Sequence, residues 1–218
     1  MSDFLVEVLY RIASGLLLPV LLTLVVLTAA TLLALGGLLR EVRERRAAAA
    51  GWRRFLADLR AGGQKAPGRL FPFEFYELPL NGYVGRFREE TALLHDNPLG
   101  MQKCLDDLEI DITRRLAQLA LATRVGPMLG LVGTLIPLGP ALTGLATGHM
   151  EVLAGNLIIA FTTTVFGILI GGFAYAISLV RRTWYEQDLS DLEFLVAVNR
   201  AAQRQPDAPC LTEEPDLA

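Results

Sequence analysis

The fold of this chain is decided by residues 125–180, which read VGPMLGLVGTLIPLGPALTGLATGHMEVLAGNLIIAFTTTVFGILIGGFAYAISLV. In these 56 residues the only Asp, Glu, Lys, Arg or His side chains are His149 and Glu151. A helix needs about 20 apolar residues to cross a bilayer, so this stretch is long enough for two spans. Lipid offers no partners to free backbone groups, so both spans are expected to be helical. The turn between them is expected at residues 147–151, where Gly148, His149 and Glu151 cluster.

A further uncharged and mostly apolar run covers residues 12–39. Its basic residues follow it, beginning with Arg40 and Arg43, and it is longer than the apolar core of a signal peptide. We therefore expect it to remain as a membrane anchor. With 52% hydrophobic and 20% charged residues, the composition agrees. The sequence predicts an all-α membrane protein with three transmembrane helices.

The basic residues predict the orientation of these helices. Of the 20 Lys and Arg residues, 19 lie in residues 40–124 and 181–218. The positive-inside rule places both segments in the cytoplasm, with the amino end and the His149 turn outside and the carboxyl end inside. The Arg-rich stretch 40–60 adjoins a span, which favours a topology signal over a nucleic-acid-binding segment.

These signals divide the chain into five parts. They are an N-terminal segment with the first span at 1–39, a cytoplasmic loop at 40–124, a transmembrane hairpin at 125–180, a cytoplasmic helix at 181–203 and a disordered tail at 204–218. Within the loop, residues 40–60 are expected to continue the first helix. Residues 61–68 (AGGQKAPG) break it, and 70–98 are interpreted as irregular. An amphipathic helix then follows, with Leu105, Leu108, Ile112, Leu116 and Leu119 on one face. Leu189, Leu192 and Val196 form a similar stripe after the third span, so the second and third helices are expected to project into the cytoplasm.

The side chains that could carry catalysis or metal binding are few and scattered. Cys104 and Cys210 are far apart without a CxxC motif, and both histidines are isolated, so we expect no metal site and no cofactor. His149 and Glu151 form a close acid–histidine pair, which is explained by a solvent-exposed turn. No nucleophile, phosphate-loop or metal constellation is present in the sequence, which argues against an enzyme.

Small or weakly polar residues recur every three or four positions along both helices of the hairpin. The second span carries Gly126, Gly130, Gly133, Pro137, Pro140, Gly144 and Thr147, and the third carries Asn156, Ala160, Thr164, Gly167, Gly171, Ala174 and Ser178. Such seams allow the close helix approach that association in lipid requires. Helix packing is therefore the interpretation for Gly126, Gly130, Gly133, Pro137, Gly167 and Gly171. A second interpretation is that part of the seam lines a narrow polar cavity. Hydroxyl groups within the membrane favour it, and the candidate pore-lining residues are Thr134, Thr163 and Thr164.

Two motifs on these spans resemble the MotA/TolQ/ExbB proton-channel family. Residues 126–138 read GPMLGLVGTLIPL and residues 160–172 read AFTTTVFGILIGG, similar to the family's Gly-Thr and Thr-Thr-x-x-Gly-Leu patterns. The resemblance implies a ring, pentameric in the family, around a one-span ExbD/TolR/MotB-like partner with a membrane Asp. By position, Thr134 and Thr164 match the family's pore-lining threonines. The chain departs from the ExbB pattern at Ile159, where that pattern has Glu, and at Pro137 and Pro140.

Two functions fit these observations. The leading one is a channel or stator subunit of an ion-motive-force-driven energy transducer in the inner (cytoplasmic) membrane. The alternative is a structural scaffold that oligomerises through the small-residue seams and conducts nothing. The spans contain no titratable Asp, Glu, Lys, Arg or His, and threonine does not ionise near neutral pH. A proton carrier must therefore come from a partner helix.

The orientation can be tested with a membrane-impermeant thiol reagent. We expect the native Cys104 and Cys210 to be shielded in intact cells and to become reactive on lysis, and a cysteine placed at Gly148 to be labelled from outside. Labelling of Cys104 in intact cells would overturn the orientation.

Overall fold

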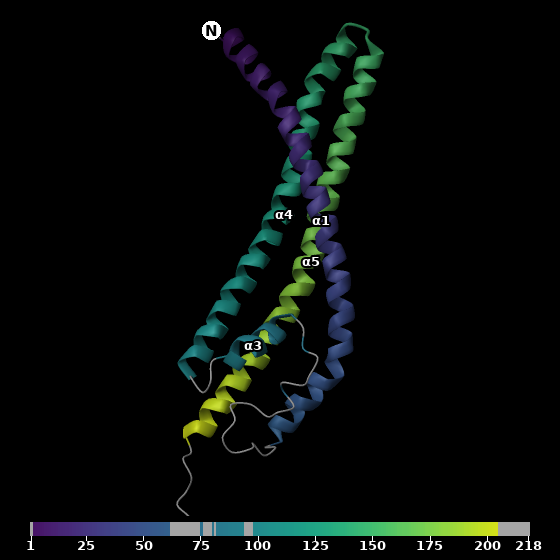
Figure 1. Ribbon diagram of the computed structural model, residues 1–218. Coiled ribbons are helices and arrows are strands. Elements are labelled where there is room, and N and C mark those ends of the chain that lie inside the picture. Colours follow the sequence, from purple (N-terminus) through teal and green to yellow (C-terminus); the bar gives the residue numbers. More distant parts are fainter. Residues whose placement is uncertain (1, 62–74, 76–79, 81, 94–97, 205–218) are drawn as a thin grey trace, which may run out of the picture. The chain divides into compact units, whose positions relative to one another are not determined.

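The computed structural model describes residues 2–61, 75, 80, 82–93 and 98–204. All regular secondary structure in these residues is helical, which confirms the predicted all-α class. The helices are α1 (Ser2–Arg60), α3 (Gly82–Leu93), α4 (Pro98–Ala146) and α5 (Met150–Arg204) (Figure 1).

Three of these helices, α1, α4 and α5, are long and apolar enough to cross a membrane. The chain is thus a multi-pass membrane protein, and the expected number of spans is confirmed. α1 continues through residues 40–60, and α5 continues through 181–203, as the sequence predicted. The expected turn is also present, because α4 ends at Ala146 and α5 begins at Met150.

Pro127, Pro137 and Pro140 lie inside α4 without ending it. Proline removes a backbone donor from the helix, and the carbonyl group it frees has to be satisfied by neighbouring groups in lipid. α4 continues as one helix through Pro137 and Pro140 to Ala146.

The interpretation of residues 70–98 as irregular is wrong for residues 82–93, which form α3. Its apolar residues Tyr83, Val84 and Phe87, together with Thr91, are all buried. They recur at helical spacing, so they form one inward face. The helix has only 12 residues, too few for its apolar period to stand out in the sequence. It begins at Gly82, which has a φ of 69°. The predicted break at 61–68 falls mostly outside the described residues, and the predicted disordered tail falls outside them beyond residue 204.

The chain divides into two compact units. The first comprises residues 1–42 and 112–183 and contains the apolar parts of α1, α4 and α5. The second comprises residues 43–111 and 184–218. The units cut across the five segments expected from the sequence, and those segments stay predictions.

The second unit has an aromatic and aliphatic core. Phe55 packs against Phe75 with ring centroids 5.8 Å apart, and Tyr83 meets Tyr185 edge to face at 4.8 Å. The two stripes expected from the sequence contribute to this core, since Leu105, Leu108, Leu192 and Val196 are all buried.

Cys104 belongs to this second unit, ahead of the apolar part of α4, and its side chain is buried. Burial, and then a hydrogen bond to the Glu90 carboxylate, raise the pKa of the Cys104 thiol to about 12. Because the thiolate is the reactive form, Cys104 is expected to label slowly even after lysis. A cysteine at the exposed Glu109, also on α4, is a better reporter of this side of the membrane.

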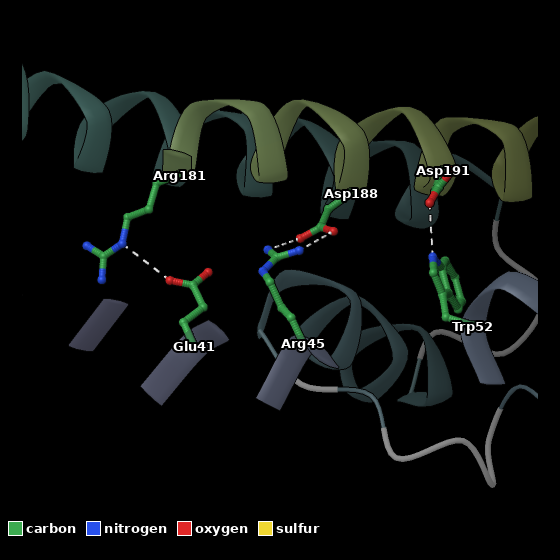
Figure 2. A network of polar contacts seen from close by, with 6 residues as sticks. All are labelled: Glu41, Arg45, Trp52, Arg181, Asp188 and Asp191. Atoms are coloured by element: carbon green, nitrogen blue, oxygen red, sulfur yellow. Dashed lines mark hydrogen bonds and ion pairs between the residues drawn. The ribbon is translucent and has the colours of Figure 1, made fainter. Parts of the chain in front are cut away.

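A row of polar contacts also stabilises the second unit (Figure 2). Arg45 donates two hydrogen bonds to the Asp188 carboxylate, one of them 2.9 Å long, and its guanidinium lies 5.1 Å from the Trp184 ring. One turn further along α5, the Asp191 carboxylate accepts a hydrogen bond of 2.9 Å from the Trp52 indole. Both aspartates are only 7% exposed. Bidentate pairing with Arg45 offsets the cost of burying the Asp188 charge, and the Arg60 guanidinium lies 3.9 Å from the Asp191 carboxylate.

We expect Asp188→Ala to destabilise the protein by about 1 to 3 kcal/mol, because Arg45 would lose its carboxylate partner in a largely buried site. Thermal unfolding in detergent measures this change. Glu193→Ala removes an exposed carboxylate from the same helix and should leave the melting temperature nearly unchanged. Equal effects of the two substitutions would contradict a specific role for the pair.

Candidate ion path along the membrane hairpin

The hairpin in the first unit closes through a short turn at residues 147–149. Gly148 has a φ of 76°, a backbone conformation that side-chain-bearing residues rarely adopt. The His149 amide donates to the Gly144 carbonyl at 2.8 Å and so caps the end of α4. A cysteine at Gly148 would therefore be strained, and the exposed neighbour His149 is the better labelling position.

The backbones of α4 and α5 touch at their glycines. A Cβ on Gly167 would lie 2.7 Å from the Gly130 Cα, and one on Gly171 would lie 2.7 Å from the Pro127 Cγ. A Cβ on Gly126 would lie 2.9 Å from the Ile170 Cγ2. These separations are too short for any side chain. The contact accordingly exists only because these positions are glycine.

All six residues assigned to helix packing are buried in the chain. They are Gly126, Gly130, Gly133, Pro137, Gly167 and Gly171. The close contacts of the five glycines connect α4 with α5 of the same chain. The closest contacts of the small-residue seam are thus made between α4 and α5 of one protomer.

The three candidate pore threonines occupy different environments. Thr163 is 3% exposed and packs against Gly133, where a Cβ would lie 2.8 Å from the Thr163 Cβ. Thr134 and Thr164 are half-buried at the same level of the hairpin, one turn or less from this contact. The geometry gives Thr163 a packing position between the helices, and only Thr134 and Thr164 remain accessible to a path outside the protomer.

Each of these hydroxyl groups donates to a carbonyl of its own helix. Thr134 Oγ1 bonds to the Leu131 carbonyl at 2.7 Å, and Thr164 Oγ1 bonds to the Ala160 carbonyl at 3.2 Å. A threonine oxygen that donates its one proton still has lone pairs that accept. In this state Thr134 and Thr164 present acceptors.

The threonines are surrounded by large apolar side chains on the outer faces of the hairpin. Leu131 and Leu135 on α4 are each 60% exposed, and Ile168 on α5 is 61% exposed. Such surfaces are stable against lipid or against another protein. No group of three or more His, Cys, Asp or Glu side chains that could hold a metal ion occurs in the described part of the chain.

The hairpin and its threonines lie inside a segment with known relatives. Residues 92–193 match the MotA/TolQ/ExbB proton channel family. The recognition of that family from the two motifs is confirmed. No curated protein and no solved structure matches the chain. The family consists of membrane proton channels that work with a MotB/ExbD/TolR-like partner, and it supports a stator-like channel function here.

From the sequence, Arg124 was expected at the end of the cytoplasmic loop, directly before the second span. The Thr123 carbonyl lies 3.1 Å from the Cβ position of Gly171, so the next residue, Arg124, lies alongside α5 about ten residues before Arg181. At 1.5 Å per residue this is about 15 Å from the charged end of the third apolar run. The antiparallel pairing of glycines is the sequence signal that could have revealed this depth.

Gly167→Ala should destabilise the hairpin by about 1 to 3 kcal/mol, because the new methyl group would overlap the Gly130 backbone. Gly172→Ala is the matched control on α5, since a Cβ there meets nothing within 4 Å. The melting temperatures of the two variants in the same detergent measure the difference in stability. If Gly172→Ala is as unstable as Gly167→Ala, the proposed role of the Gly130–Gly167 contact is wrong.

Proposed function

We propose that this protein is the channel or stator subunit of an ion-motive-force-driven energy transducer. In this proposal several copies form a ring around a one-span partner whose membrane helix carries a titratable carboxyl group. The observation that carries it is the placement of Thr134 and Thr164 at one level of a hairpin that matches a proton channel family. These hydroxyls are polar, accessible and flanked by residues that cannot ionise.

The ring is supported by the surface that a single chain leaves uncovered. The tight glycine contacts of the hairpin are satisfied within the protomer, so contacts between copies would use the outer apolar faces. The half-buried threonines then come to lie where neighbouring hairpins meet a central helix. This arrangement weakens the scaffold alternative, because the residues expected to drive its oligomerisation already pack inside one chain.

The proposed partner supplies what the hairpin lacks. A protonated carboxyl group can donate to Thr134 or Thr164 as they stand, because both oxygens have free lone pairs. An ionised carboxylate needs donors instead, so a threonine hydroxyl would have to turn away from its own helix carbonyl. The two rotamers would thus serve the two protonation states, and they lower the cost of burying the charge.

The proposed membrane is the inner one, with the amino end and the residue 147–149 turn outside. The distribution of basic residues supports this orientation, since 19 of 20 flank the spans on the same side. The second unit, with its Arg45–Asp188 and Trp52–Asp191 contacts, would then lie in the cytoplasm.

Proton flux into proteoliposomes tests the proposal. The purified chain alone should give no specific proton conductance, whereas the complex with the one-span protein that co-purifies with it should conduct. Thr164→Val should reduce flux through the complex about ten- to hundredfold, the loss expected for one hydrogen bond to a charged group.

Thr162→Val serves as the control, because Thr162 is exposed on a different face of α5 and bonds to its own helix at 2.7 Å. Robust flux through the chain alone would refute the need for a partner carboxylate. Full activity of a Thr134→Val, Thr164→Val double variant would refute the role of the threonines.

A further inference from the structure

A cavity of about 390 Å³ opens between α1, α4 and α5 in the first unit. All three helices that line it are long and apolar enough to span the membrane. The cavity lies apart from Thr134 and Thr164, whose side chains do not line it. The cavity is therefore not part of the proposed ion path.

One end of this cavity is basic and polar. Arg115 and Gln118 of α4 and Arg181 of α5 line it together. Arg181 is largely buried, with 19% of its side chain exposed, and its Nε atom lies 3.3 Å from a Glu41 carboxylate oxygen (Figure 2). This Nε makes no hydrogen bond, because the approach of Glu41 is poorly aligned. Arg115 and Arg181 thus both line this end of the cavity, and the Glu41 carboxylate contacts the guanidinium group of Arg181.

The other end of the cavity is apolar. Its wall is formed by Leu27 and Ala30 of α1, Leu119 and Ala122 of α4, and Ala174 and Ile177 of α5. Ala174 lies seven residues inward from Arg181 along the apolar run, a distance of about 10 Å. The cavity therefore extends from the charged boundary of the spans into the depth of the acyl chains.

We propose that this cavity binds an anionic phospholipid. The lipid phosphate would meet Arg115, Gln118 and Arg181, and the first part of an acyl chain would follow the apolar wall. Only an amphiphile matches both ends of the site at this depth. Guanidinium groups bind phosphate through several hydrogen bonds at once. Arg181 and the small residues Ala30, Ala122 and Ala174 then act as one lipid site.

The site is tested with delipidated full-length protein in detergent. Dioleoyl phosphatidylglycerol is titrated against dioleoyl phosphatidylcholine, with native mass spectrometry counting bound lipids and thermal unfolding reporting affinity. We expect one tightly bound phosphatidylglycerol per chain and a clear preference over phosphatidylcholine. Arg115→Gln should weaken phosphatidylglycerol binding about fivefold, as expected for one basic residue near an anionic headgroup.

Two further variants separate this site from general electrostatic attraction. Arg114→Gln removes the neighbouring exposed charge, which does not line the cavity, and should keep the phosphatidylglycerol preference. Ala122→Leu fills the apolar end while leaving every arginine in place, and it should abolish the tight site. Because Arg114→Gln and Ala122→Leu leave the Arg181–Glu41 contact intact, both are expected to fold.

The opposing outcomes are equally specific. Equal binding of both lipids, or equal losses in Arg114→Gln and Arg115→Gln, would overturn the proposal. So would a thermal shift reproduced by inorganic phosphate alone, which would indicate a free-anion site, or occupation of the cavity by a second copy of the chain.

Discussion

Direct backbone contact between α4 and α5 is the constraint on which the membrane part of this protein depends. Lipid tails are as apolar as leucine, so burial alone does not hold two helices together in a bilayer. Where the Gly130 and Gly167 backbones touch, dispersion attraction between them holds the two helices together in place of the hydrophobic effect. The remaining features of the hairpin follow from it, because it sets the register that brings Thr134 level with Thr164 and Arg124 alongside the third span.

The second unit obeys a different rule. Its core of Phe55, Phe75, Phe87 and Leu108 is built from large side chains instead of glycine. Charged groups are also buried there where they are paired, as Arg45 and Asp188 show. The same two helices, α4 and α5, thus pack through small residues in the first unit and through bulky ones in the second.

The sequence was sufficient for features that depend on local composition. Each of these features is encoded by consecutive residues and was predicted to within a few residues. They are the apolar runs of about 20 residues, the Gly148 turn and the family motifs. Features that depend on which face meets which neighbour were missed. Thr163 and Thr164 are adjacent in sequence, and only the helix contact shows that the first is buried against Gly133. α3 was missed because its three buried aromatic and β-branched residues are too few to show a helical period in the sequence. The cavity at Arg181 was missed because residues of three different helices line it.

The glycine contact also determines where this sequence is free to drift. A single-nucleotide change that replaces glycine gives a residue with a Cβ or a stop codon, and a Cβ would come within 3.0 Å of another atom at Gly126, Gly133, Gly167 and Gly171. At Gly15, Gly36, Gly155 and Gly172 the same changes meet open space within the chain. A side chain is therefore most costly at Gly167, where it meets the Gly130 backbone, whereas the second group has room within the protomer for a small apolar side chain. Glycine content alone is then a poor guide to constraint in a membrane helix, and the distance to the facing backbone is the better one.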